Sequence, residues 1–555
     1  MQKALWTWGY VGLVAGMAVF ALVFLRREIA LPIASAPPHI IRTQWPSLQQ
    51  AAKWLALAAV PSALILSTTT YLTTDITALP LLWVLPLALY LLSFVIAFSE
   101  NASLALWLSK NARLTLALLG ILALATDAFE VQITGFASLA FLFISGLTFH
   151  RQLFDERPAP VGLTAFYIIL AAGGALGGML MAIVAPLLFN WSYEYPILIV
   201  VAIAMAHHRA PKPSHALAMI LLTFALGLVT SVLFDWHRPT QIWLALSFAI
   251  LLLFSHKHKW ALLAISTFAI LSLSVLDALF LSSYGLHQRS YFGIYTISEN
   301  ETGTLRTLTH GTTTHGVQHL ANGRTLEPTG YFGPNSGVGR VLSQAPELIG
   351  PRARIGIIGM GAGTLACYGR DGQSWTFYEI DPLVVDIAVR QGWFTFMANC
   401  APDAQIKLGD ARLTLPKEPD QSLDILVMDA FSSDAVPTHL LTAEAFDIYE
   451  HVLAHHGMLL LHISNRYLDL EPVLARETET RGWAAALLKY EPSADERETG
   501  ERASIWVVMS KSPPLLDIAI QGGEWRKLNI IDGFRRWTDD YGSVLSLIKW
   551  RDAGG

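Results

Sequence analysis

The sequence has 555 residues, of which 53% are hydrophobic and 15% are charged, whereas about 25% of residues are charged in soluble proteins. Its mean hydropathy of +0.44 is too high for a purely soluble protein. The average hides a change near residue 285. Residues 1–285 contain 14 Lys and Arg against 10 Asp and Glu, and the remainder contains 24 against 33. These values exclude a single soluble domain, a disordered chain and a fibrous repeat. The acidic second part also argues against a nucleic-acid partner, which would require clustered Lys and Arg.

Apolar runs long enough to cross about 30 Å of hydrocarbon recur through residues 1–285. Because two of them are short, we expect eight to ten spans. This region is therefore predicted to be a multi-pass α-helical domain in the inner (plasma) membrane, with the lipid bilayer as a partner. The spans are expected at 5–25, 53–73, 79–98, 113–130, 133–149, 163–189, 193–208, 215–234, 240–255 and 260–281.

Four glycines lie close together in the predicted span 163–189. Gly173 and Gly177 form one Gly-xxx-Gly pair, and Gly174 and Gly178 form a second, overlapping pair. This spacing lets another helix approach closely in a membrane. Helix packing explains the pattern, so we assign it no further function.

Ionisable residues fall within or at the ends of several predicted spans. Such groups can line a polar path, or they can simply sit at the water interface. We favour the interface for most of them and single out Asp75 for mutation. The set is Asp75, Asp127, Glu130, Glu194 and Asp277.

Cysteines and histidines give no sign of a metal site. Cys367 and Cys400 provide neither a disulfide framework nor four zinc ligands, and we expect free thiols in a reducing compartment. His310, His315 and His319 fall within ten residues, but no carboxylate stands at ligand spacing. Structural or hydrogen-bonding roles are expected for these histidines.

From residue 286 the pattern changes to short alternating segments separated by turn residues. Residues 286–340 are predicted to form a small β unit. Residues 341–513 alternate strands with helices, which indicates a parallel, doubly wound α/β sheet of the Rossmann-like type. Residues 514–555 are expected to form a helical tail.

Ligands bind such sheets at the carboxyl ends of the strands. The first strand is followed by Gly359-Met-Gly361-Ala-Gly363, a turn that allows the backbone to approach a nucleoside closely. Glu379 stands 20 residues after Gly359 at the next strand end. A carboxylate there can hold ribose hydroxyls, as in nucleotide-binding folds.

The following strand ends carry more carboxylates. Asp410-Ala411 follows the third strand, where an acceptor can meet the adenine amino group. The fourth strand ends in Asp429-Ala-Phe-Ser-Ser-Asp434. His462 ends a strand at the same edge. We give equal weight to two roles for it, lining the site and serving as a hydrogen-bonded histidine at the end of a strand. A glycine loop, Glu, Asp and Asp at four successive strand ends form a specific set, which predicts a nucleoside site.

With these residues the sequence resembles the spermidine synthase family of aminopropyltransferases over residues 290–510. More closely, it is similar to the membrane-embedded spermidine-synthase-like proteins of bacteria. The stretches shared with the first family are Ile-Ile-Gly359-Met-Gly-Ala-Gly363-Thr, Tyr-Glu379-Ile-Asp381-Pro, Gly-Asp410-Ala and the loop from Asp429. Those shared with the second include Asp75-Ile-Thr-Ala-Leu-Pro, Glu194-Tyr-Pro196, Arg289-Ser-Tyr-Phe-Gly293 and His462-Ile-Ser-Asn-Arg466.

The resemblance implies an AdoMet-methyltransferase-type fold and transfer of an aminopropyl group. The donor would be decarboxylated S-adenosylmethionine (AdoMet), the acceptor a small-molecule amine such as putrescine, and the product methylthioadenosine, with no metal. Carried over by motif, Glu379 would bind the ribose, Asp410 the adenine, and Gln318 would lie beside the nucleoside. Asp381, Ala411 and the loop glycines would complete this nucleoside site.

The same resemblance implies an amine site around Asp429. This carboxylate would be the base or the orienter of the attacking amine, with Asp434 and Tyr331 beside it. The chemistry is consistent, because the amine must lose a proton to become nucleophilic and a carboxylate can accept it. Acidic residues would also attract a cationic substrate.

The sequence departs from the family at several places. Soluble members carry Asp in the glycine loop where this chain has Ala362, and an acidic-acidic-x-x-Tyr-His-Glu pattern where it has Glu327-Pro-Thr-Gly-Tyr331-Phe-Gly. Their second loop Asp falls where this chain has Ser432. Fewer carboxylates weaken the case for putrescine. An uncharged glycine loop suits intact AdoMet, whose carboxylate an Asp would repel.

Two alternatives therefore stay open. One is an enzyme acting on intact AdoMet by methyl or aminocarboxypropyl transfer or by cleavage, since the fold does not separate these reactions. The other is an amine transporter with a nucleoside-sensing domain, in which Asp75 and Asp277 would matter most. A homodimer is also left open.

Loop charges and chemistry disagree about the side of the membrane. The loops around 26–53, 99–112, 150–162, 209–214 and 256–259 hold about a dozen Lys and Arg and should be cytoplasmic. With ten spans, this places the second half outside. AdoMet-type nucleosides are made in the cytoplasm, so we expect the catalytic domain there, with 193–208 re-entrant.

Overall fold

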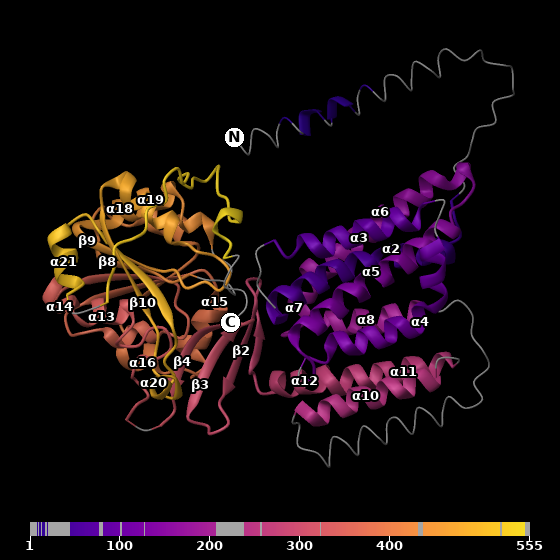
Figure 1. Cartoon of the computed structure of the whole chain (residues 1–555), viewed down its shortest axis with the longest axis horizontal. Coiled ribbons are helices and arrows are strands. Elements are labelled where there is room, and N and C mark those ends of the chain that lie inside the picture. The colour runs from indigo at the N-terminus through magenta and orange to yellow at the C-terminus, as the bar shows by residue number, and fades with distance from the viewer. Residues whose placement is uncertain are drawn as a thin grey trace. The chain divides into compact units, whose positions relative to one another are not determined.

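The computed structural model describes residues 45–549 with gaps at 77–80, 100–102, 127, 207–237, 256–257, 322, 431–436 and 522–523, and a few positions between 8 and 19 (Figure 1). The chain divides into two compact units. The first, called the helical unit, contains Arg42–Ser298 and Thr309–Thr313. The second, called the α/β unit, contains Glu299–Leu308 and the chain from Thr314 onward.

The helical unit is a bundle in which α2 packs on α6 and α4 packs on α5 (Figure 1). Helices α2 and α6 each run on into a π-helical turn, as does α11. The described elements are α2 (Leu48–Tyr71), η1 (Leu72–Ile76), α3 (Val84–Ala97), α4 (Ser103–Leu124), α5 (Val131–Asp155), α6 (Leu163–Met179), η3 (Leu180–Val184), α7 (Ala185–Leu188), α8 (Glu194–Met205), α10 (Arg238–Ser255), α11 (Lys259–Ile270), η4 (Leu271–Val275) and α12 (Leu276–Ser283).

Four helical segments are long and apolar enough to cross a membrane, and four shorter apolar helices accompany them. They coincide with eight of the predicted spans. The predicted spans 5–25 and 215–234 lie largely or wholly outside the described residues. The long segments are Leu48–Thr74, Val131–Asp155, Pro160–Leu188 and Lys259–Ser283, and the shorter ones are Val84–Ala97, Asn111–Leu124, Glu194–Met205 and Gln241–Ser255.

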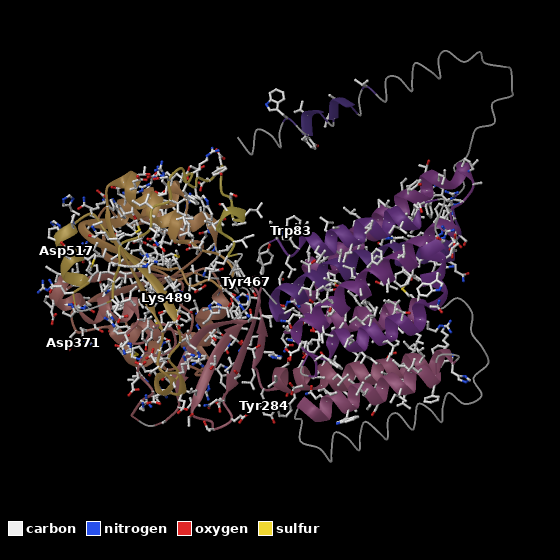
Figure 2. The ribbon with its side chains drawn as sticks, viewed as in Figure 1. Trp83, Tyr284, Asp371, Tyr467, Lys489 and Asp517 are labelled. Atoms are coloured by element: carbon white, nitrogen blue, oxygen red, sulfur yellow. A yellow bond between two sulfur atoms is a disulfide. The ribbon has the colours of Figure 1, made fainter. Side chains whose placement is uncertain are left out.

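Aromatic side chains stand at the ends of two of these helices. Trp83 precedes α3 and Tyr284 follows α12, and both are labelled in Figure 2. Their exposed fractions are 52% and 62%. Trp and Tyr are enriched at membrane–water interfaces because their rings are amphipathic. Their positions therefore suit the ends of membrane-crossing helices.

Only one of the two Gly-xxx-Gly pairs faces α2. A Cβ atom on Gly173 would lie 2.6 Å from the Leu55 carbonyl oxygen, and one on Gly177 would overlap the Ala59 carbonyl oxygen. A Cβ on Gly174 would meet nothing within 4 Å, and one on Gly178 only reaches a Leu66 methyl at 4.0 Å. Helix geometry explains the difference, because residues one position apart point to different faces.

We expect Gly177→Ala to lower the melting temperature of the detergent-solubilised chain, and Gly178→Ala to leave it within a degree or two. The first change forces α6 away from the α2 backbone at a cost of about 1–3 kcal/mol. The second adds a methyl to an open position. Thermal unfolding followed by intrinsic fluorescence would measure both, and equal melting temperatures would contradict the packing.

Glu194 is buried, whereas we expected most of the ionisable residues to lie at the water interface. It lies in the first turn of α8 and pairs at 3.0 Å with Arg289 of β1 (His287–Arg289), their side chains being 4% and 7% exposed. Arg289 also donates to the Trp191 carbonyl at 3.2 Å. Two segments about 95 residues apart thus meet in one buried ion pair. Asp127 and the Asp75 side chain lie outside the described residues.

Two sheets follow the helices along the chain. The first has the order β1-β2-β3-β4, with β2 (Ile294–Glu299), β3 (Leu305–His310) and β4 (Thr313–His319). The second has the order β10-β11-β9-β8-β5-β6-β7. Its strands are β5 (Arg354–Ile358), β6 (Ser374–Glu379), β7 (Gln405–Leu408), β8 (Leu423–Met428), β9 (Leu453–His462), β10 (Ala484–Tyr490) and β11 (Ser504–Ser510).

The seven-stranded sheet is mixed, which corrects the prediction of a parallel sheet. Strands β7, β6, β5, β8 and β9 are parallel, whereas β11 runs antiparallel to both β9 and β10. The chain returns from β10 through the five-residue helix α20 (Ala494–Glu498), too short to cross over the sheet, and β11 therefore enters in the opposite direction. The Rossmann-like α/β character of the remainder agrees with the prediction.

Short helices connect and cover these strands. The helix predicted after the glycine loop is a five-residue 3₁₀ helix, η5. The described connecting helices are α13 (Gly337–Ser343), α14 (Ala345–Leu348), η5 (Thr364–Tyr368), α15 (Pro382–Val385), η6 (Asp386–Arg390), α16 (Phe396–Cys400), α17 (Ala411–Thr414), η7 (Leu415–Lys417), η8 (Thr438–Leu440), α18 (Ala443–Val452), α19 (Glu471–Arg481) and α21 (Pro513–Ala519).

The tail after α21 is not helical over its described residues, apart from a 3₁₀ turn at Leu545–Leu547, which corrects the expected helical tail. Arg526 and Arg536 instead pair with the carboxylates of Glu471 and Glu477 on α19. Trp537 is buried in the core formed with α18 and β9. Side-chain ion pairs and one buried ring hold this segment where helical hydrogen bonds were expected.

The two cysteines form a disulfide, so the prediction of free thiols is wrong. Cys367 of η5 and Cys400 of α16 are brought together with a Cα–Cα distance of 4.8 Å, because these two short helices pack on each other. Disulfides persist in oxidising compartments and are rare in the cytoplasm. The pair therefore argues against the reducing compartment that we expected for these cysteines.

We expect the chain isolated without a reductant or a thiol-blocking agent to show no reaction with maleimide–polyethylene glycol after denaturation. Reduction before labelling should add two labels, because the sequence holds two cysteines. Cys367→Ser should give one label without reduction, since Cys400 then has lost its partner. Two labels on the unreduced native chain would show free thiols and restore the reducing-compartment interpretation.

Candidate active site

The register of the parallel strands brings the predicted site residues to one edge. Ile358 pairs with both Tyr378 and Met428, and Met428 pairs with Leu461. Glu379 pairs with Leu408. The next residues on four of these strands are Gly359, Gly409, Asp429 and His462. Together with Glu379, the last residue of β6, they mark the ends of five neighbouring strands at one edge.

The glycine loop is shaped by two close approaches. Gly359 has φ +91°, and a Cβ atom on it would overlap the Asp429 carbonyl oxygen. Gly361 has φ +53°, and its Cβ would overlap the carbonyl oxygen of His315 from β4. Gly363 begins η5. Side chains at the first two positions are excluded both by the left-handed backbone and by these neighbours.

Glu379 is a buried carboxylate, 7% exposed, beneath this loop. Its Oε2 accepts the Met360 N–H at 2.8 Å, and its Oε1 accepts the Asp381 N–H at 2.9 Å. Burial raises the pKa of Glu379, and these backbone N–H groups oppose the rise. Asp381, 1% exposed, accepts the Leu383 N–H and caps α15. A carboxylate keeps further lone pairs after two such bonds, so Glu379 can still accept from ribose hydroxyls.

Gln318 of β4 is held by its neighbours. Its Nε2 donates to Thr395 Oγ1 at 2.7 Å and to the Thr325 carbonyl at 2.9 Å, and its Oε1 accepts the Thr395 N–H at 3.2 Å. The side chain is 1% exposed. Gln318 thereby fixes the segment before α16, and its contact with a nucleoside stays a prediction. Thr395 was missed because no motif marks it.

Asp410 caps the helix that follows β7. Its Oδ1 accepts the Arg412 N–H at 2.9 Å and lies 3.7 Å from His439 Nε2. Ala411 is the first residue of α17 and is buried. Capping explains the local sequence, and the other carboxylate oxygen has capacity for a further donor.

Asp429 and Tyr331 are brought together, and their role in an amine site stays a prediction. The Tyr331 hydroxyl is hydrogen-bonded to Asp429. Burial of Tyr331 and, to a smaller extent, the nearby Asp429 carboxylate raise the pKa of Tyr331 well above its usual value. His462 Nδ1 lies 2.6 Å from Asp429 Oδ1, the two side chains being 7% and 9% exposed. Asp434 lies outside the described residues.

His462 is enclosed by two aromatic rings. Tyr331 stacks on one side with ring centroids 4.7 Å apart, and Trp506 of β11 stacks at the same distance with an interplanar angle of 20°. His462 Nε2 lies 2.7 Å from Ser464 Oγ. Both ring nitrogens of His462 therefore have partners, and its role in lining the site stays a prediction. Sequence reasoning missed Trp506 and Ser464, although Ser464 follows His462 by two residues.

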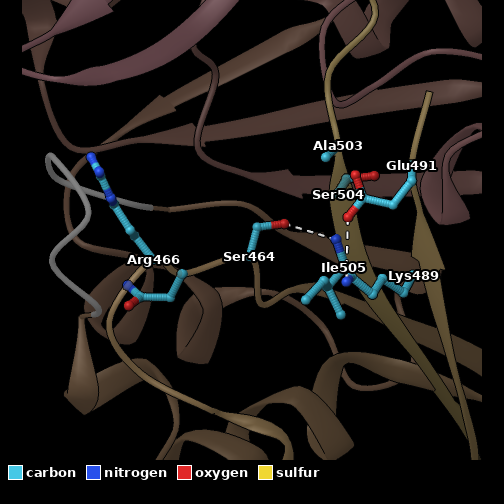
Figure 3. Close-up of a pocket in the computed structure, with 8 residues that line it drawn as sticks. Ser464, Arg466, Lys489, Glu491, Ala503, Ser504 and Ile505 are labelled. Carbon is cyan, nitrogen blue, oxygen red and sulfur yellow. Dashed lines mark hydrogen bonds and ion pairs between the residues drawn. The ribbon is translucent and has the colours of Figure 1, made fainter. Parts of the chain in front are cut away.

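Ser464 borders a cavity of about 220 Å³, drawn in Figure 3. The Ile505 N–H donates to Ser464 Oγ at 2.7 Å, the dashed line beside Ser464 in that view. Arg466, Lys489 and Glu491 also line the cavity. Ser464 thus lies between His462 and this cavity.

Within the described part of the chain, no three His, Cys, Asp or Glu side chains are grouped so that they could hold a metal ion. His310 lies against Tyr295 in the helical unit, and the His315 carbonyl accepts the Ala362 N–H in the α/β unit. These contacts fit the structural roles expected for the two histidines, and a metal-free reaction stays a prediction.

No protein-family model matches this sequence. A segment covering 21% of the chain is 30% identical over 125 residues to the polyamine aminopropyltransferase of Vibrio vulnificus strain CMCP6. The chain spans 40% of the length of that relative. The sequence is therefore weakly homologous to a polyamine aminopropyltransferase over part of its length.

Solved structures of low identity match part of this chain. A probable spermidine synthase from Corynebacterium glutamicum is 16% identical with a TM-score of 0.33, covering 44% of this chain and 90% of that one. Spermidine synthase from Thermotoga maritima is 15% identical with a TM-score of 0.30, covering 44% and 79%. An O-methyltransferase from Bacillus cereus in complex with SAH is 17% identical with a TM-score of 0.23, covering 31% and 79%.

Proposed function

We propose that the chain is a membrane-bound, spermidine-synthase-like aminopropyltransferase. It transfers the aminopropyl group of decarboxylated AdoMet to a small-molecule amine and releases methylthioadenosine. The observation that carries the proposal is the Asp429 carboxylate, held by Tyr331 and His462 at the strand edge that also carries the glycine loop. Partial homology to the Vibrio vulnificus polyamine aminopropyltransferase supports it.

The proposed nucleoside site is formed by Glu379 on the ribose, Asp410 on the adenine amino group and the loop Gly359–Gly363 beneath the sugar. Gln318, Asp381 and Ala411 support its walls. Glu379 is suited to this role because backbone N–H groups keep a buried carboxylate in place with capacity left for hydroxyl donors.

In the proposed reaction the amine nitrogen attacks the propyl carbon bonded to the sulfonium sulfur. The new C–N bond forms as the C–S bond breaks, and the bonding pair neutralises the sulfur of the leaving methylthioadenosine. The attacking nitrogen must give up one proton, which Asp429 accepts, and Tyr331 orients the carboxylate. Positioning and general base catalysis supply the acceleration.

Intact AdoMet is the second candidate donor, and Ala362 favours it. This residue is fully buried, and its methyl lies where Gly316 of β4 packs against it, so no carboxylate faces the donor from this loop position. Ala362 offers no acidic partner to the ammonium group of decarboxylated AdoMet. It also does not repel the carboxylate of intact AdoMet. Methyl or aminocarboxypropyl transfer, or cleavage, would follow from this donor.

The deciding experiment gives the purified full chain AdoMet and decarboxylated AdoMet separately, with and without putrescine, and identifies the nucleoside product by mass. Methylthioadenosine formed only from decarboxylated AdoMet and an amine supports the proposal. S-adenosylhomocysteine would establish methyl transfer instead, and methylthioadenosine released from intact AdoMet without an amine would establish cleavage. If both donors are inert, the nucleoside-sensing transporter becomes the preferred function.

The membrane location, the possibility of a homodimer and the cytoplasmic side of the α/β unit are parts of this proposal. The disulfide stands against the cytoplasmic side. An outward-facing site would have to receive its nucleoside from outside the cell, and the maleimide experiment above therefore bears directly on the substrate supply.

A further inference from the structure

We propose that His462 is a positioning residue that holds Asp429 in place through a hydrogen-bond chain beginning at the backbone of β11. The inference rests on the proposed function. It concerns three described side chains, Ser464, His462 and Asp429, which lie just after β9, at the end of β9 and just after β8.

The hydrogen bonds of these residues can all point from the β11 backbone toward Asp429. The Ile505 backbone N–H can only donate, so Ser464 Oγ accepts from it at 2.7 Å. The Ser464 hydroxyl hydrogen is then available for His462 Nε2, also at 2.7 Å. When Nε2 accepts, a neutral imidazole carries its proton on Nδ1, which faces Asp429 Oδ1 at 2.6 Å.

Asp429 is the terminal acceptor of two donors in this arrangement, His462 Nδ1–H and the Tyr331 hydroxyl. Two hydrogen bonds donated to a carboxylate fix its rotamer. The imidazole cannot swing away, because it is stacked between Tyr331 and Trp506 at 4.7 Å on each side. His462 therefore transmits the position of the β11 backbone to a carboxylate at the end of β8, two strands away.

Side chains of different length at position 462 distinguish the roles of the two ring nitrogen atoms. His462→Ala should lower kcat by about 10- to 100-fold with little change in the KM for the nucleoside, because a hydrogen bond to a charged group is lost. His462→Asn should recover most of kcat, since its amide nitrogen stands near the position of Nδ1. His462→Gln should not, because its amide reaches the position of Nε2.

Ser464→Ala provides a second test beside the cavity. It removes the donor that fixes the tautomer, and we expect a fall in kcat of about 3- to 10-fold. Melting temperatures of all variants serve as the folding control. Equal kcat for wild type and folded His462→Ala, or equal rates for the Asn and Gln variants, would overturn the inference.

A measurement independent of catalysis distinguishes failure of this inference from failure of the proposed function. Nitrogen NMR of the full chain with ¹⁵N-labelled histidine, assigned by loss of one signal in His462→Ala, reads the tautomer directly. We expect a protonated Nδ1 and an unprotonated Nε2 at His462, changed in Ser464→Ala. The opposite tautomer would refute the chain even if the wild type transfers aminopropyl groups, and inert wild type with the expected tautomer would refute only the function.

Discussion

Asp429→Asn is expected to reduce amine-dependent release of methylthioadenosine by about 100- to 10,000-fold, the usual range for loss of a general base. The asparagine amide keeps the size of the side chain and its oxygen can still accept from His462, but it cannot take a proton. The loss should therefore appear in kcat, while the affinity for methylthioadenosine changes little. Steady-state rates and calorimetric titration with methylthioadenosine would measure the two effects.

Asp424→Asn is the matched control for this substitution. Asp424 lies on the same strand, β8, and accepts from Arg354 at 2.7 and 3.0 Å near the opposite end of the sheet. The change should lower stability by weakening that pair and leave kcat within about two-fold, because distant sites act independently. Unchanged turnover in Asp429→Asn would remove Asp429 from the mechanism. If the chain is instead a transporter that only senses the nucleoside, Asp429→Asn would leave transport intact.

Glu379→Gln is expected to weaken binding of methylthioadenosine and of the nucleoside donor by about 10- to 100-fold, the scale of a lost charge-assisted hydrogen bond. Two effects combine in this prediction. The ribose hydroxyls lose a charged acceptor, and the amide can no longer accept from both the Met360 and Asp381 N–H groups. The glycine loop that includes Met360 should therefore also become less ordered. Calorimetric titration would measure the affinity.

Glu471→Gln controls for the loss of a buried carboxylate as such. Like Glu379, Glu471 is 7% exposed, and it accepts the Asn529 N–H at 2.7 Å and pairs with Arg526. It belongs to α19, outside the proposed nucleoside site. This variant should lose thermal stability and retain nucleoside affinity. A similar loss of affinity in both variants would mean that Glu379 acts only through the fold.

The sequence was sufficient to predict the strands that form the candidate site. Buried apolar runs such as Arg354–Ile358 and Leu423–Met428 are separated by helical segments, and this alternation specifies parallel strands whose carboxyl ends meet at one edge. Polar residues placed directly after such runs, including Glu379 and Asp429, are then predicted to lie together. The apolar spans of residues 48–283 were likewise readable, because hydropathy depends on composition along the chain.

Contacts between distant segments decided the rest. Cys367 and Cys400, 33 residues apart, meet because η5 packs on α16, and no local pattern encodes that packing. The irregular tail paired with α19 and the choice of Gly177 over Gly178 depend on neighbours that are remote in sequence. The same holds for Ser464, His462 and Trp506, whose hydrogen bonds and ring contacts exist only once β8, β9 and β11 lie side by side. Periodicity fixes which residues a strand exposes, whereas long-range packing fixes what those residues touch.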